Sequence, residues 1–196
     1  MSNPLIIEHL SKYISLSPEE SAYFLSLLTE KKLRRRQHLL REGEICYHST
    51  FVLEGCLRGY TVDKNGYEHI LQFAPPGWWI TDMYSLLSGQ AGDLFIEALE
   101  PSELQLLHIR DREKLIAEIP KFERFFRIIA ENSLVNFRQR LMGNLGLSAR
   151  ERYLSFCRRY PTLIECLPQK QIALYIGVTP EFLSKMRAAL LKERKR

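Results

Sequence analysis

The stretch from residue 167 to 190, LPQKQIALYIGVTPEFLSKMRAAL, constrains the fold of this chain more than any other. Its first half predicts a short helix, because Ile172 and Ile176 are four residues apart and share one helical face. Gly177 follows where that helix must end and the chain must turn, a task that glycine performs at little conformational cost. Apolar residues then recur at spacings of three and four: Leu183, Met186 and Leu190. Two short helices joined by a tight turn are typical of the DNA-binding helix-turn-helix.

The start of the second helix is marked by three consecutive residues. Thr179 is a suitable N-cap, Pro180 fits the first helical position, and Glu181 lies in the first turn. A hairpin of two helices in an ordinary bundle is the alternative, although the small Ala173 suits two closely crossing helices. Glu181 could accept a hydrogen bond from cytosine, and Lys185 could donate one to guanine or phosphate. The predicted DNA-binding residues are Gln169, Lys170, Thr179, Pro180, Glu181, Ser184, Lys185 and Arg187.

The positive charge of the chain is concentrated around this motif. Residues 150–196 hold eleven Lys and Arg against four acidic residues, a net charge of +7, whereas the rest of the chain carries −2. A basic face can simply be solvated, but its coincidence with the helix-turn-helix indicates a partner that presents phosphates, and we expect double-stranded DNA.

Composition narrows the class of protein further. The length of 196 residues and the apolar content of 45% fit one large or two small globular domains. No apolar run is long enough to span a membrane, and the N-terminus lacks the features of a signal peptide. The cysteines show neither CxxC spacing nor paired histidines, which favours reduced thiols in a cytoplasmic protein over disulfides, metals or cofactors. They are Cys46, Cys56, Cys157 and Cys166.

Three regions precede the helix-turn-helix: a helical region, a region of short strands and a long helix. Residues 5–30 are predicted to be helical, with a capping box at Ser17 and Glu20. From residue 32 to 107 the pattern changes to short strands, with segments at 51–54, 56–62, 67–73 and 95–109 punctuated by glycines. Asn65-Gly66 is a strong hairpin-turn signal. The expected fold class is therefore α+β, with an N-terminal antiparallel β-roll.

A long helix follows the strands, opened by Pro120 and closed by Gly143 and Gly146. About 24 residues at ~1.5 Å each give a rod of roughly 36 Å. The helix carries two apolar stripes. The first comprises Phe122, Phe126, Ala130, Leu134, Phe137, Leu141 and Leu145. The second, made of Phe125, Ile128, Ile129 and Val135, is expected to pack on the roll. The first stripe is then left for a partner helix in a homodimer, although it could also pack on the roll, and we predict dimerisation through its last six residues.

Roll, long helix and C-terminal helix-turn-helix in this order resemble the Crp/Fnr family of bacterial transcription regulators. The resemblance rests on residues 41–79 and 168–187 and covers nearly the whole chain. It implies a cyclic-nucleotide-binding type of jelly roll in residues 1–118, a dimerisation helix in 119–146 and a DNA-binding domain in 147–196. It also implies a roughly palindromic operator, with RNA polymerase as a further partner to consider.

The chain departs from the family where the nucleotide phosphate would bind. Thr81-Asp82 stands in place of a Gly-Glu pair, and Gly92-Asp93 in place of an Arg-Ser pair. Losing the arginine removes bidentate bonds to phosphate, and Asp93 adds repulsion. Cyclic AMP is therefore not the expected effector, which is an unknown small molecule or none. The candidate pocket residues, of which Arg58 could replace the missing cation, are Arg58, Phe73, Trp79, Asp82, Tyr84, Gly92 and Asp93.

Two other classes of protein compete with a regulator. A cupin-like metal-dependent enzyme needs clustered ligands, and only His48, Glu68 and His69 are candidates, without a His-x-His pair. A pure dimerisation scaffold would leave the basic C-terminal segment without a purpose. We expect a regulator rather than an enzyme.

Overall fold

A computed structural model describes residues 4–193, without the side chains of Glu165, Cys166 and Glu193. The chain forms two compact units, which are described separately: Met1–Thr61 with Leu71–Asn132, and Val62–Ile70 with Ser133–Arg196. The predicted division into a roll, a dimerisation helix and a DNA-binding domain remains a prediction. No helix of the described residues is long and apolar enough to cross a membrane. The basic end of the chain at 194–196 lies outside the described residues.

Two short helices open the first unit, α1 (Pro4–Ser11) and α2 (Pro18–Ser26). Ser17 caps α2 in the predicted capping box, with its hydroxyl accepting from the Glu20 amide and the Glu20 carboxylate accepting from the Ser17 amide. The predicted helical region extended too far, because strand β1 (Leu28–Leu33) begins inside it. β1 pairs with the distant strand β8, Leu28 opposite Leu107, and this long-range pairing outweighs the local helical pattern.

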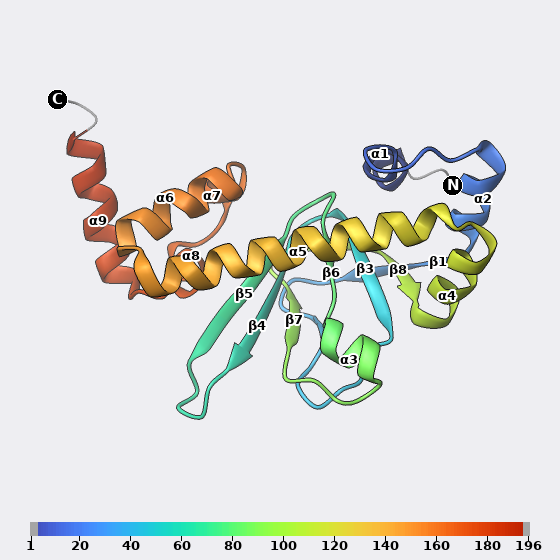
Figure 1. Cartoon of the computed structure of the whole chain (residues 1–196). Coiled ribbons are helices and arrows are strands. Elements are labelled where there is room, and N and C mark those ends of the chain that lie inside the picture. Colours follow the sequence, from blue (N-terminus) through green and yellow to red (C-terminus); the bar gives the residue numbers. More distant parts are fainter. Residues whose placement is uncertain (1–3, 194–196) are drawn as a thin grey trace. The chain divides into compact units, whose positions relative to one another are not determined.

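The strands form two four-stranded sheets, which together make up the roll (Figure 1). The first has the order β1-β8-β3-β6 and the second β2-β7-β4-β5. Asn65-Gly66 forms the predicted turn between β4 and β5, where the Gly66 amide donates to the Asp63 carbonyl with a positive φ of 81°. The remaining strands are β2 (His38–Leu40), β3 (His48–Glu54), β4 (Leu57–Val62), β5 (Glu68–Ala74), β6 (Trp79–Ile80), β7 (Phe95–Ala98) and β8 (Ser102–His108).

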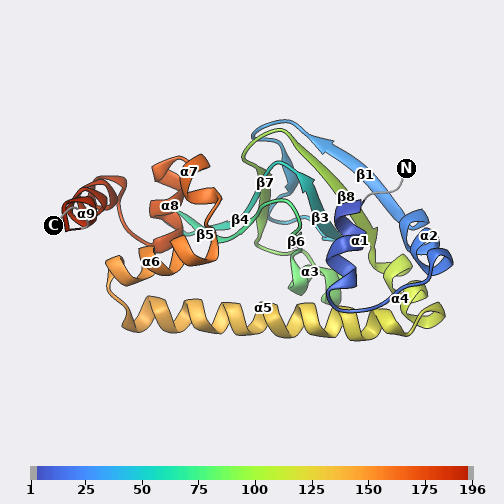
Figure 2. The same ribbon diagram turned by 90° about the horizontal axis from the view of Figure 1, so that it is seen from above.

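The first unit has two apolar clusters, one on each face of the sheet that holds β3. Val52 on β3 belongs to the cluster inside the roll, together with Leu57, Ile96 and Leu104. The neighbouring Phe51 points the other way, as the alternation of a strand requires, and joins a cluster with α1 and the start of α5. Figure 2 shows α1 and this part of α5 beside the strands. The outer face of the sheet is thus covered by helices.

Two helices of the first unit were not predicted. α3 (Met83–Ser88) lies between β6 and β7, and α4 (Ile109–Glu118) follows β8 directly. The strand predicted over 95–109 is instead a pair of strands with a turn, and it ends at His108. The His108 ring accepts from the Arg110 amide, so the last residue of the strand also caps the helix.

The long helix is confirmed as α5 (Lys121–Gly146). Its first half belongs to the first unit, where Phe122 and Phe125 are buried in the outer apolar cluster. Its second half, from Ser133 onward, belongs to the second unit. The second unit continues with α6 (Ala149–Arg159), α7 (Leu163–Cys166), α8 (Gln169–Ile176) and α9 (Pro180–Glu193). Ser148 and Glu151 form a capping box at the start of α6.

Candidate nucleic-acid interface and effector region

Helices α8 and α9 form the predicted helix-turn-helix. Gly177 ends α8 in the left-handed conformation, with φ 73° and ψ 46°, and its amide donates to the Ala173 carbonyl. The Thr179 hydroxyl accepts from the Phe182 amide at 3.2 Å, so Thr179 caps α9 as predicted. Ile172, Ala173, Ile176 and Leu183 are fully or almost fully buried and hold the two helices together.

The predicted DNA-binding residues lie on the exposed surface of this unit. All are exposed except Arg187, which is partly buried. Backbone and Thr179 hydrogen bonds lower the pKa of Glu181, which is therefore ionised at neutral pH. The placement of Glu181, Ser184 and Lys185 on one exposed helix gives an acceptor, a hydroxyl and a cation that can reach base edges or phosphates.

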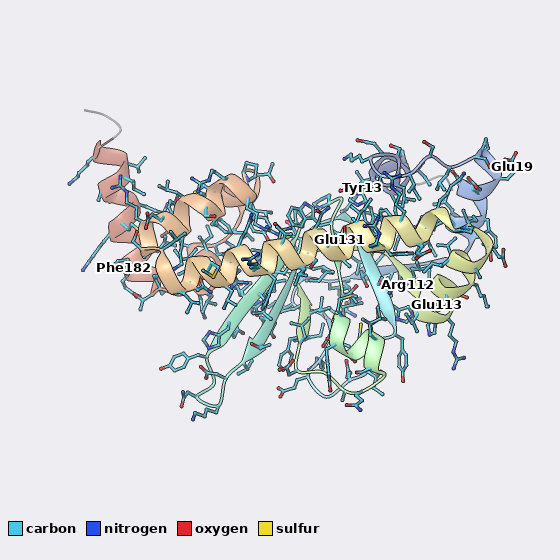
Figure 3. All side chains as sticks on the ribbon, in the orientation of Figure 1. Tyr13, Glu19, Arg112, Glu113, Glu131 and Phe182 are labelled. Atoms are coloured by element: carbon cyan, nitrogen blue, oxygen red, sulfur yellow. The ribbon has the colours of Figure 1, made fainter. Side chains whose placement is uncertain are left out.

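Phe182 was missed among these candidates. It is 51% exposed on α9, between the polar residues of the first turns (Figure 3). The sequence holds a signal for it, since Phe182 is off the buried spacing of Leu183, Met186 and Leu190. An exposed aromatic ring at this place can contact a thymine methyl group.

The predicted dimerisation stripe divides into a buried and an exposed part. Phe126 is partly buried in the outer cluster of the first unit, beneath the Arg112 guanidinium at 4.7 Å from its ring centre. Leu134 and Leu145 are 68% and 75% exposed, and Ala130 is exposed too. Val135 was expected to pack on the roll but is 53% exposed. The exposed apolar residues of the second half of α5 are Leu134, Val135, Phe137, Leu141, Met142 and Leu145.

Arg58, the candidate substitute cation, is engaged within the roll. It is directly opposite Glu97 on the neighbouring strand, and its Nε donates to Glu97 Oε2 at 2.8 Å. Both residues are buried. Their sequence neighbours Leu57 and Ile96 point into the roll, so strand alternation places the pair on the other face of the sheet. The guanidinium is thus held by a carboxylate outside the roll interior.

The turn that corresponds to the family's phosphate cassette is closed around a carboxylate. Asp82 caps α3, with Oδ1 accepting from the Ser85 amide at 3.1 Å, and Asp82 is buried. A Cβ atom on Gly92 would lie 2.1 Å from Asp82 Oδ2, so only glycine fits at position 92 without a shift. Asp93 is exposed beside it. An anion in this turn would meet a buried carboxylate.

The aromatic candidates of the effector pocket point in different directions. Phe73 is fully buried. Trp79 packs against Phe51 and Phe125 in the outer cluster, with ring centres 5.2 and 6.2 Å apart. Tyr84 is 60% exposed and its hydroxyl donates to the Gln90 side chain. The structure therefore does not bring these residues together into one site.

The two histidines considered as metal ligands contact other side chains. The His69 ring pairs with Asp63 at 2.8 Å, and the His48 ring contacts that of His108 with centres 5.0 Å apart. Among the described residues no group of three or more His, Cys, Asp or Glu could hold a metal ion. The Cys56 thiol donates to the Leu57 carbonyl, and burial raises the pKa of the Cys46 and Cys157 thiols.

Comparison with known proteins defines the class of this fold. Residues 30–118 match the family of cyclic nucleotide-binding domains. FixK2 from Bradyrhizobium japonicum has a similar structure, with a TM-score of 0.72, 22% identity and 85% of each chain covered. A CooA mutant from Carboxydothermus hydrogenoformans gives a TM-score of 0.71 at 18% identity, covering 96% of this chain and 84% of that one.

A further similar structure, from Eubacterium rectale, is assigned to the Crp/Fnr family of transcriptional regulators. Its TM-score is 0.68 at 16% identity, with 91% of this chain and 85% of that chain covered. No curated protein sequence matches the chain. The chain thus contains a cyclic nucleotide-binding type of domain and has the fold of Crp/Fnr regulators, as the sequence predicted.

Proposed function

We propose that this protein is a dimeric, sequence-specific DNA-binding transcription regulator of the Crp/Fnr type. The observation that carries the proposal is the α8–α9 unit, with its left-handed Gly177, its buried seam and its exposed polar row. The net charge of +7 on residues 150–196 supports it, because phosphate contacts supply much of the affinity of such proteins.

The first turns of α9 enter the major groove in this proposal. Glu181, Ser184 and Lys185 read base edges, and Phe182 makes an apolar contact there. Thr179 and Pro180 fix the start of the helix, so they determine how α9 enters the groove. Gln169 and Lys170 at the start of α8 are exposed and contact the phosphate backbone.

Dimerisation supplies the second helix-turn-helix that a palindromic site requires. Two recognition helices must be about 34 Å apart to reach successive major grooves. The exposed apolar row on the second half of α5 supports self-association, because large contiguous apolar patches are rare on monomers. A parallel helix from a second copy would bury Leu134, Phe137 and Leu141.

The roll of this regulator does not bind cyclic AMP through the family's phosphate cassette. Two observations support this proposal. The buried Asp82 carboxylate would repel a phosphate, and the Arg58 guanidinium already donates to Glu97. The effector is another small molecule, or the roll has none.

A binding assay on selected operators tests the DNA-binding role. Genomic fragments retained by the full-length protein define the site, and fluorescence anisotropy then measures affinity at fixed salt. Lys185→Ala should weaken binding by about 1–3 kcal/mol, because it removes a contact to guanine or phosphate. Lys192→Ala, which removes an exposed charge in the last turn of α9, is the matched control and should change affinity less. Unchanged operator affinity in both Lys185→Ala and Arg187→Ala would refute the assignment.

A further inference from the structure

A pocket in the first unit lies where the connection from α1 to α2 meets the start of α5. It has a volume of about 420 Å³ and is lined by residues 11–15 together with Lys121 and Arg124. Figure 2 shows this connection beside the first turns of α5. Small-molecule sites commonly have volumes of about 300–1,000 Å³, so the pocket has the size for an organic ligand rather than for a single inorganic ion.

Both walls of the pocket are fixed by contacts inside the first unit. Ile14 is only 7% exposed and belongs to the outer apolar cluster. The Tyr13 ring packs against the Phe125 ring of α5, with centres 5.8 Å apart. On the side of α5, Lys121 Nζ donates to the Glu20 carboxylate of α2 at 2.8 Å. The pocket is therefore present before a ligand binds, so ordering its walls costs little binding free energy.

The charged side chains of the lining are all basic: Lys12, Lys121 and Arg124. Among the described residues that line the pocket, none is an aspartate or a glutamate. Two carboxylates lie close by, since Glu20 accepts from Lys121 and Glu8 is 3.9 Å from Lys12. The Lys12–Glu8 pair is largely exposed and therefore contributes little. Three cations against two carboxylates leave an excess of positive charge at the pocket, which favours an anion.

We propose that this pocket binds a small organic anion with two negative charges, of the phosphate monoester class. A phosphate monoester carries about −1.5 to −2 charges at pH 7, and ammonium and guanidinium groups are strong hydrogen-bond donors to its oxygens. The Ser15 hydroxyl adds a polar group to the lining, and Tyr13 and Ile14 supply apolar surface for the body of the ligand. A cyclic phosphodiester carries a single charge, so the proposal does not extend to cyclic AMP.

The pocket is a separate site from the interior of the roll. No described residue of its lining belongs to the apolar cluster that fills that interior. Lys121 and Arg124 lie in the first turn of α5, whereas residues 11–15 lead from α1 towards α2. A ligand that contacts both would tie the start of α5 to the N-terminal helices and would stabilise the first unit. The inference goes beyond the proposed function and does not depend on it.

Calorimetry with the full-length protein tests the proposal, with 1-naphthyl phosphate as the probe. Inorganic phosphate, which lacks the apolar body, and 1-naphthoate, which has one charge, are measured at the same pH and ionic strength. The probe should bind with a sub-millimolar dissociation constant, about tenfold or more below that of either comparison compound. The reason is that it alone offers both an apolar body and a second charge.

Variants on neighbouring turns of α5 locate the site. Arg124→Gln should weaken binding of 1-naphthyl phosphate by about tenfold or more, since a charge-assisted hydrogen bond is lost. Arg127→Gln, which removes an exposed arginine one turn further along and outside the lining, is the matched control and should bind as the wild type does. Lys185→Gln, on α9, should also bind as the wild type does, because the probe does not occupy the surface that we propose for DNA.

A second pair of variants changes the charge of the pocket without removing any of its cations. Ser15 is exposed, so a longer side chain fits there without disturbing the core. Ser15→Glu should abolish detectable binding, because its carboxylate repels the probe and pairs with the cations, whereas the neutral Ser15→Gln of nearly the same size should still bind. The proposal is overturned if 1-naphthyl phosphate binds no better than the comparison compounds, or if Arg124→Gln and Arg127→Gln behave alike. Equal binding by the two Ser15 variants, or loss of binding in Lys185→Gln, would overturn it too.

Discussion

The roll and the helical end of the chain differ in their balance of charge. In the roll, the buried Arg58 is paired with Glu97 on the adjacent strand, and the two share a hydrogen bond at 2.8 Å. At the helical end, residues 150–196 carry a net charge of +7. A neutral buried pair needs no external partner, whereas an excess of positive charge along one segment attracts anions. The difference teaches that the partners of this protein are to be sought first at its helical end.

Breaking the matched pair in the roll should have the largest effect. Arg58→Ala leaves the Glu97 carboxylate buried without its cation, which should lower the free energy of unfolding by about 3–5 kcal/mol. Urea denaturation followed by circular dichroism measures this. Lys32→Ala, which removes the exposed ion pair with Glu103 on the same roll, is the control and should cost roughly 0–1 kcal/mol. Equal costs for the two variants would show that the buried pair does not stabilise the roll.

The apolar row on α5 gives the next largest expected effect. Leu134→Glu combined with Leu141→Glu should weaken self-association by at least about a hundredfold, because each buried leucine contributes roughly 1.5–3 kcal/mol. Sedimentation equilibrium over a range of protein concentrations measures the dimer constant. Asn132→Glu adds a charge at an exposed polar position of the same helix and is the control. A double variant that remains as dimeric as the wild type would show that the partner contacts another face.

The sequence predicted best where local chemistry decides the structure. The capping box at Ser17, the turn at Gly66 and the turn at Gly177 each depend on residues close in the chain. The predicted helical region wrongly included the start of β1, because the strand that pairs with β1 is about eighty residues away in the sequence. The Arg58–Glu97 pair was not predicted for the same reason, because its two residues come together only when the chain folds. The exposed site residues of α9 followed directly from helical periodicity.

A partly buried histidine beside the outer cluster of the roll should give a smaller, pH-dependent effect. The His9 ring contacts the rings of Tyr13, Phe51 and Phe125, and burial together with the nearby charge of Lys12 lowers its pKa. The unfolded chain therefore binds a proton at His9 more readily than the native state does. Its neutral form contributes stability above pH ~6.5, and this contribution is lost as the pH falls through the lower native pKa.

Comparing His9→Phe with the wild type measures this contribution. The Tm of the wild type should fall more steeply between pH 7 and pH 5 than that of His9→Phe, which cannot take up the proton. Tyr13→Phe alters the same aromatic cluster without touching the imidazole, so it should keep the wild-type slope. Parallel Tm profiles for the wild type and His9→Phe would exclude His9 as a source of acid sensitivity in the roll.

Cyclic nucleotides should have no effect at all, and this is the sharpest test of the contrast between the two regions. A cyclic phosphate carries one negative charge, and taking it out of water is costly unless a cation or several donors meet it. At the corresponding turn the roll presents the buried Asp82 and the exposed Asp93, and the candidate substitute cation, Arg58, is bound to Glu97. Calorimetry with cyclic AMP and cyclic GMP should therefore detect no binding at sub-millimolar concentrations. A micromolar dissociation constant would contradict this expectation, and its loss in Arg58→Lys would show that Arg58 leaves Glu97 to hold the phosphate.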